Sequence, residues 1–231
     1  MTTPLVLAHR GWSARAPENS LEAMVLATGS GADGVELDVH ETLDGGFVVH
    51  HDADVRHGLI AALPQSFIIG HVGKSGAPVP LLTEVLGALA ERQPGATVFI
   101  EVKAMRSWPR LKSLLRPYLE VLDLEVQSFN TWLLAAMAES PDSLPRGWIT
   151  ADPGPDPVAR LRELGARTLS LRHDAITPVL VKDIHAAGFR IAAWTVNDST
   201  RARELAHLGV DALIGDDPAL LHATLIDFAT T

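Results

Sequence analysis

Short runs of apolar residues alternate with longer amphipathic segments along the whole chain. Apolar runs rich in β-branched residues are typical of strands, whereas apolar positions that recur every three or four residues are typical of helices. The runs predict strands at residues 5–9, 35–39, 97–102, 125–129, 148–150, 168–171, 190–196 and 212–215. The amphipathic segments predict helices at residues 20–29, 83–91, 108–118, 131–138, 157–164, 178–187, 199–208 and 218–228. This alternation predicts a (β/α)8 TIM barrel rather than an open doubly wound sheet.

The starts of several predicted helices carry capping signals. Asn19 or Ser20 can cap the first helix, and Pro157 and Pro178 stand where proline suits a first turn. Asp198 can cap the seventh helix in the same way. These signals support the predicted helix boundaries.

The connection after the second predicted strand is longer than the alternation of strands and helices requires. A turn at residues 44–46 and a short apolar run at residues 47–50 predict a hairpin after the second strand. The next thirty or so residues contain no single regular element. We predict one domain spanning residues 1–231, with an insertion at residues 46–80. Barrel enzymes have their active sites on the face where this insertion lies, so we interpret it as a lid or substrate-recognition segment; the alternative is a disordered surface loop.

The composition restricts the class of protein. Hydrophobic residues make up 47% and charged residues 20% of the chain, as in ordinary globular enzymes. A formal charge of −9 argues against a nucleic-acid partner, and the absence of cysteine excludes disulfides and thiolate metal sites. The chain has neither a signal-peptide pattern nor the ~20 apolar residues that span a bilayer. We therefore expect a cytoplasmic enzyme without stable membrane insertion.

Three carboxylates lie on neighbouring predicted strands. Glu36 and Asp38 are two residues apart, so both side chains point to the same face, which in a barrel is the interior. Glu101 lies on the next long strand, with Lys103 on the same face. Bare carboxylates there would repel each other and would be costly to desolvate, and a bound hard cation removes both problems. We predict one divalent cation, Mg²⁺ or Ca²⁺, because all-oxygen ligands favour these ions; the alternative is surface charges at strand ends.

Two histidines occupy comparable positions. His9 ends the first strand and is followed by Arg10, whose guanidinium can grip a phosphate with two hydrogen bonds. His51 ends the short extra strand and precedes Asp52, which could orient it or cap the following turn. Two histidines across a phosphodiester can act as base and acid, because the ordinary pKa of imidazole lies near neutrality. Histidines are often structural, but the joint placement with Arg10 and the carboxylates favours catalysis.

Trp194 lies near the end of the seventh predicted strand, where it could form an apolar wall for a substrate or pack in the core. The chain contains no P-loop, no dinucleotide-binding glycine pattern and no nucleophile elbow. The usual nucleotide-binding and serine-hydrolase classes are therefore excluded.

Taken together, these motifs resemble the glycerophosphodiester phosphodiesterase family. The resemblance rests on residues 9–11, 17–20, 36–38, 49–52, 79–81, 101–103, 128–129, 194–197 and 209–211. The matches keep a consistent order over nearly the whole chain. The chain departs from the family pattern at residues 53–58, in the length of the insertion, and at residues 214–216, where the family often has a threonine.

The resemblance implies a barrel enzyme that uses a divalent cation to split a small-molecule glycerophosphodiester into glycerol 3-phosphate and an alcohol. It implies that a glycerol hydroxyl attacks first, giving a cyclic phosphate that water then opens. The implied roles are metal binding for Glu36, Asp38 and Glu101, base and acid for His9 and His51, and phosphate neutralisation for Arg10 and Lys103.

Two alternatives remain open. A lysophospholipase D would act on lysophospholipids and would need an apolar entrance near Trp12, Phe67 and Trp194. A non-catalytic barrel would bind phosphodiesters without cleaving them. The sequence does not decide between Mg²⁺ and Ca²⁺, and it does not identify the leaving alcohol or the oligomeric state.

Overall fold

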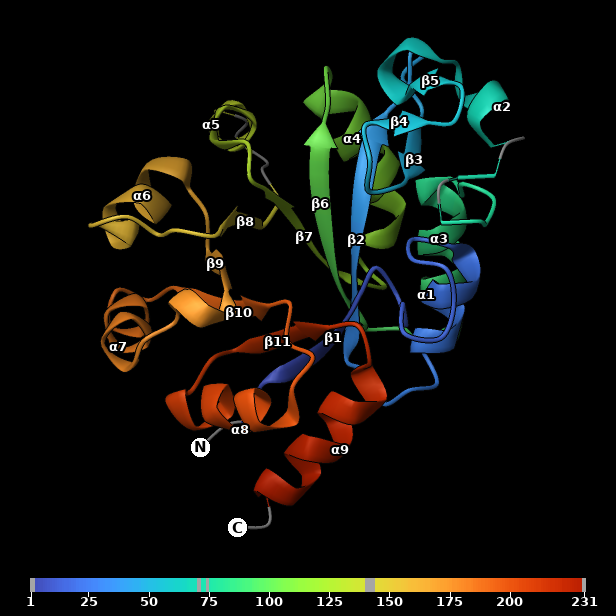
Figure 1. Cartoon of the computed structure of the whole chain (residues 1–231). Coiled ribbons are helices and arrows are strands. Elements are labelled where there is room, and N and C mark those ends of the chain that lie inside the picture. Colours follow the sequence, from blue (N-terminus) through green and yellow to red (C-terminus); the bar gives the residue numbers. More distant parts are fainter. Residues whose placement is uncertain (1–2, 70–71, 74, 140–143, 230–231) are drawn as a thin grey trace.

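The structure is a computed structural model that describes residues 3–69, 72–73, 75–139 and 144–229 (Figure 1). Parallel strands form a closed barrel, in which β11 pairs with β1 and β1 pairs with β2. The barrel strands are β1 (Leu5–His9), β2 (Gly34–Glu41), β6 (Thr97–Ala104), β7 (Asp123–Ser128), β8 (Arg146–Thr150), β9 (Thr168–Arg172), β10 (Arg190–Trp194) and β11 (Ala212–Gly215). The predicted (β/α)8 TIM barrel is confirmed.

Helices cover the outside of the barrel and follow the strands along the chain (Figure 1). They are α1 (Leu21–Ala27), α3 (Leu82–Arg92), α4 (Trp108–Leu115), α5 (Thr131–Ala138), α6 (Pro157–Leu164), α7 (Pro178–Ala186), α8 (Ser199–Leu208) and α9 (Pro218–Ala229). The prediction extended the third of the expected helices to residue 118, whereas α4 ends at Leu115 and a 3₁₀ turn follows. Pro117 lacks the backbone N–H that the next α-helical hydrogen bond requires. None of the described helices is long and apolar enough to cross a membrane.

The insertion after β2 has its own small core. Strand β3 (Phe47–Val49) pairs antiparallel with β2, and β4 (Asp54–Val55) forms a hairpin with β5 (Gly58–Leu59). A 3₁₀ turn and the short helix α2 (Gln65–Ile68) follow. The side chains that form this core are Val48, Val55, Ile60, Ile68 and Val79. The described part of the predicted insertion is therefore folded, while Gly70, His71 and Lys74 lie outside the described residues.

The inner face of the barrel is divided between apolar and polar side chains. One cluster packs apolar side chains at the centre and consists of Leu7, Phe99, Ala192, Ala212 and Ile214. Beside it, Gln127 Nε2 donates to Glu125 Oε1 at 2.9 Å, and Ser170 Oγ donates to Gln127 Oε1 at 2.7 Å. Arg167 Nε pairs with Glu125 Oε2 at 2.5 Å, so this buried carboxylate is neutralised within the fold.

Strands β2 and β6 carry the predicted metal ligands, and Gly34 sets how closely the two strands approach. A Cβ at Gly34 would lie 1.8 Å from the carbonyl oxygen of Thr97. Because that atom belongs to the backbone, no side-chain rotation can relieve the clash. Gly87, in the middle of α3, has open space where a Cβ would lie.

We predict that Gly34→Ala lowers the free energy of unfolding by about 3 kcal/mol, because the two strands must move apart. The matched control Gly87→Ala should raise it by about 0.5–1 kcal/mol, since alanine suits a helix interior better than glycine. Chemical denaturation monitored by circular dichroism measures both changes. A denaturation midpoint for Gly34→Ala equal to that of the wild type would show that the spacing of β2 and β6 does not depend on this glycine.

Candidate active site

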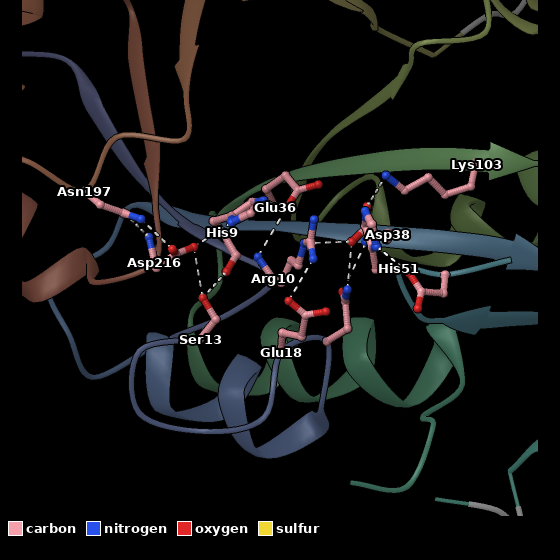
Figure 2. A network of polar contacts seen from close by, with 12 residues as sticks. His9, Arg10, Ser13, Glu18, Glu36, Asp38, His51, Lys103, Asn197 and Asp216 are labelled. Carbon is pink, nitrogen blue, oxygen red and sulfur yellow. Dashed lines mark hydrogen bonds and ion pairs between the residues drawn. The ribbon is translucent and has the colours of Figure 1, made fainter. Parts of the chain in front are cut away.

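The predicted site residues come together at the carboxyl ends of the barrel strands (Figure 2). Of these residues, His9, Arg10, Glu36, His51, Glu101, Lys103 and Trp194 line one pocket of about 150 Å³. Asp38 is 1% exposed and contacts two of the residues that line it. Parallel strands present their carboxyl ends at one rim, which is why residues distant in the sequence meet here.

The three carboxylates form one buried cluster. Glu36, Asp38 and Glu101 are 6%, 1% and 7% exposed, and each offers one oxygen within 4.8 Å of the other two. Asp38 and Glu101 are register partners across β2 and β6, and Glu36 lies two residues earlier on the same face as Asp38. Ligand distances to Mg²⁺ or Ca²⁺ are ~2.0–2.6 Å, so oxygens this close can share one ion. The cluster therefore could hold a single divalent cation.

The electrostatics of the cluster show a shortage of positive charge. Burial raises the pKa of Glu36 well above its ordinary value, and the neighbouring carboxylates Asp38 and Glu101 raise it further. Burial and the charge of Asp38 raise the pKa of Glu101 to about 7. Burial also opposes the ionisation of Asp38, but Lys103 and Arg10 outweigh it and lower the pKa of this group. The cations thus favour the ionised form of Asp38, while Glu36 and Glu101 favour protonation when no further cation is bound.

The two cationic side chains are held in place by the carboxylates. Lys103 Nζ lies 2.9 Å from Asp38 Oδ1 and 2.6 Å from Glu101 Oε1. Arg10 Nε lies 3.2 Å from Asp38 Oδ2, and its Nη1 lies 2.7 Å from Glu18 Oε2. Both cations therefore stand at the pocket wall, where they can also face an anionic ligand (Figure 2).

Asn19 has a different role from the capping role considered for it. Ser20 caps α1 by accepting from the backbone N–H of Ala23. Asn19 Nδ2 instead donates to Asp38 Oδ2 at 2.8 Å, and Asn19 Oδ1 accepts from the backbone N–H of Asp38 at 3.2 Å. Asn19 thereby fixes the orientation of the most buried carboxylate.

Each histidine of the pocket is paired with an aspartate. His9 Nδ1 lies 2.6 Å from Asp216 Oδ1, and His51 Nδ1 lies 2.9 Å from Asp52 Oδ1. An ionised carboxylate can only accept, so the Nδ1 of each ring carries the proton. In both rings, Nε2 is left to exchange protons with a ligand. The contact of Asp52 with His51 fits the first of the two roles considered for it, the orientation of this ring.

Asp216 is a residue of this site that the sequence analysis did not identify. In the sequence it belongs to residues 214–216, which were noted only as a departure from the family pattern. Asp216 Oδ1 also accepts from Ser13 Oγ at 3.2 Å, and its Oδ2 accepts from Asn197 Nδ2 at 2.5 Å. The hydrogen bond from His9 lowers the pKa of Asp216 despite its burial, so the carboxylate stays ionised. Barrel closure is the signal that could have found it, because it places the end of β11 beside the end of β1.

Trp194 both packs and lines the pocket. Its ring meets Phe129 edge to face, with centroids 5.6 Å apart, and its Nε1 donates to the carbonyl oxygen of Ser170 at 3.0 Å. Phe129 and Trp194 form an apolar wall, and Gln127 and Ser170 add polar groups to the same pocket. Neither Trp12 nor Phe67, both described by the structure, lines this pocket.

Known proteins of one family are similar to this chain over most of its length. The model of the glycerophosphoryl diester phosphodiesterase family matches residues 9–220. A glycerophosphodiester phosphodiesterase from Caldanaerobacter subterraneus is 29% identical over 234 residues, which cover 94% of this chain and 96% of the relative. A putative glycerophosphodiester phosphodiesterase from Bacillus subtilis is 29% identical, and the alignment covers 92% of this chain and 94% of the relative.

A solved structure shares the whole barrel. It is that of an Oleispira antarctica phosphodiesterase in complex with the product sn-glycerol-3-phosphate. It has a TM-score of 0.88 and 29% sequence identity, and the alignment covers 97% of each chain. Since the family model extends over most of the barrel, the chain belongs to the glycerophosphodiester phosphodiesterase family and is a phosphodiester hydrolase.

Proposed function

We propose that this enzyme hydrolyses glycerophosphodiesters to glycerol 3-phosphate and an alcohol, with one divalent cation and two histidines. The observation that carries the proposal is the cluster of Glu36, Asp38 and Glu101, whose oxygens lie within 4.8 Å in a pocket that His9 and His51 also line. The product bound to the Oleispira antarctica phosphodiesterase supports glycerol 3-phosphate as the product here.

The residues of the cluster fit a hard cation. All three ligands are carboxylates, which suit Mg²⁺ and Ca²⁺, and the raised pKa values of Glu36 and Glu101 indicate that further positive charge would stabilise their ionised forms. When bound, such a cation polarises a phosphoryl oxygen and offsets the charge that develops in the transition state. We propose Glu36, Asp38 and Glu101 as the ligands of that ion.

Arg10 and Lys103 are proposed to bind the phosphate. Both line the pocket, and the pKa of each is raised; burial opposes the charge, and neighbouring carboxylates outweigh it, so both side chains remain cationic. The guanidinium of Arg10 offers several N–H donors, and the ammonium of Lys103 is a compact charge. Trp194 and Phe129 are proposed to contact the carbon atoms of the glycerol group.

The two histidines are proposed to move protons at Nε2. His9, held by Asp216, accepts the proton of the glycerol hydroxyl that attacks phosphorus, and His51, held by Asp52, gives a proton to the departing alcohol oxygen. The internal hydroxyl is already close to phosphorus, which makes this route favourable. In the second step the roles reverse, as His51 deprotonates water and His9 returns a proton to the glycerol oxygen.

Hydrolysis of glycerophosphocholine, measured as glycerol 3-phosphate released, tests the proposal. Purified enzyme should lose activity in excess EDTA and regain it when Mg²⁺ or Ca²⁺ is restored, because the carboxylates then have their cation. Activity that persists unchanged after thorough EDTA treatment would contradict the metal-dependent mechanism. Failure to release glycerol 3-phosphate under any of these conditions would contradict the proposed substrate.

We further predict that His9→Ala lowers kcat by at least ~10²-fold, the low end for a positioned acid–base group. Asp216→Asn should lower kcat by at least ~10-fold with little change in KM, because the amide does not hold the proton on Nδ1 of His9 as a carboxylate does. Steady-state kinetics on glycerophosphocholine measures both. An Asp216→Asn variant that changes KM alone would show that Asp216 does not act through His9.

A further inference from the structure

His40 is a buried histidine that lies beside the active site but does not line its pocket. It follows Asp38 by two residues on β2, so strand alternation places both side chains on the same face. His40 is 5% exposed, so its ring is enclosed by protein and is not available to a ligand. A polar side chain buried in this way needs a hydrogen-bond partner within the fold.

The partner of His40 is the backbone of the histidine proposed as the acid. His40 Nε2 lies 3.2 Å from the carbonyl oxygen of His51. A carbonyl oxygen can only accept, so Nε2 carries a proton and donates the hydrogen bond. This bond ties a side chain of the barrel strand β2 to the segment that follows β3.

The backbone of His51 lies beyond the regular pairing of the strands. Strand β3 runs beside β2 and ends at Val49 (Figure 1). The next residue, His50, still bonds to β2, since its N–H donates to the carbonyl oxygen of Asp38 at 2.9 Å. Within the described residues, His51 forms no hydrogen bond to another backbone group. The position of His51 therefore depends on side chains.

Two side chains hold His51 in different ways. The neighbouring Asp52 bonds to the ring, and His40 bonds to the carbonyl oxygen. The first contact fixes the direction of the ring, whereas the second fixes the backbone from which the ring projects. Misplacement by about 1 Å can cost ~10²-fold in rate, so the second contact bears directly on proton transfer.

We propose that His40 is a positioning residue, which holds the backbone of His51 where its Nε2 can give a proton to the departing alcohol oxygen. The inference rests on the proposed role of His51. In that step the glycerol oxygen bonds to phosphorus and its proton passes to His9. The bond from phosphorus to the alcohol oxygen breaks, and this oxygen takes the proton from His51.

Leaving-group dependence tests the proposal, because a choline alkoxide needs a proton to depart whereas 4-nitrophenolate does not. His40→Leu should lower the single-turnover rate of choline release from glycerophosphocholine by at least ~10-fold. Release of 4-nitrophenolate from the 4-nitrophenyl ester of glycerol 3-phosphate should fall by less than ~3-fold. Single turnovers report the first step of the reaction alone. An equal loss with both esters, or no loss with either, would overturn the proposal.

Three further variants separate the hydrogen bond from the packing of the ring. His40→Gln carries an N–H donor at a similar reach and should restore most of the choline-release rate lost in His40→Leu. His40→Asn has a shorter amide and should be as slow as His40→Leu, which keeps the test decisive if His40→Leu does not fold. The matched control His207→Leu removes a hydrogen bond from an exposed histidine to the carbonyl oxygen of Arg203 on α8, and it should alter neither rate. A rate for His40→Gln as low as that of His40→Leu would contradict the role of this hydrogen bond.

An NMR measurement without substrate separates this inference from the proposed function. In the metal-free protein, the carbonyl carbon resonance of His51 should move upfield in His40→Leu, because the oxygen loses a donor, and return toward its wild-type position in His40→Gln. An unchanged resonance in His40→Leu would overturn the inference whether or not the enzyme is active. If the resonance moves but the wild type hydrolyses neither ester under any metal condition, the contact with His51 is supported and the proposed function fails.

Discussion

Three carboxylates buried within a few ångströms of one another need positive charge around them. Two cationic side chains at the rim of this barrel supply part of it. Lys103 bridges Asp38 and Glu101, and Arg10 pairs with Asp38 from the opposite side. These cations lower the pKa of Asp38 but leave those of Glu36 and Glu101 raised. A divalent ion could supply the charge that is still needed, so the cluster that is costly to bury without an ion is suited to hold one.

Closure of the barrel completes the candidate active site. Strand β11 pairs with β1, and this pairing places Asp216 against His9, the first site residue along the chain. Ser13 and Asn197 hold the same carboxylate, so its position does not depend on one contact. On the other side of the pocket, the insertion after β2 supplies His51 together with its own aspartate. The two histidines proposed to transfer protons thus have their rings held by separate elements.

Much of this arrangement was predictable from the sequence because it depends on local alternation. The spacing of Glu36 and Asp38 places both on one face, and a barrel turns that face inward. Asp216 was not predictable in the same way, since its partner is 207 residues away and the contact exists only after closure. The exposure of Trp132 was equally hidden: the apolar sequence of α5 predicts a helix, but only the neighbouring segments determine which of its residues are covered.

Calorimetric titration of the metal-free protein with Mg²⁺ or Ca²⁺, in buffers of different ionisation enthalpy, tests most directly whether the carboxylate cluster is a cation site. Because the pKa of Glu101 is raised to about 7, this group is partly protonated near neutral pH and must ionise to bind the ion. The pKa of Glu36 is shifted in the same direction. One ion should bind per chain and release at least a few tenths of a proton at pH 7, with the release declining as the pH rises. Binding without proton release at pH 7, or no binding of either ion, would contradict the role assigned to the cluster.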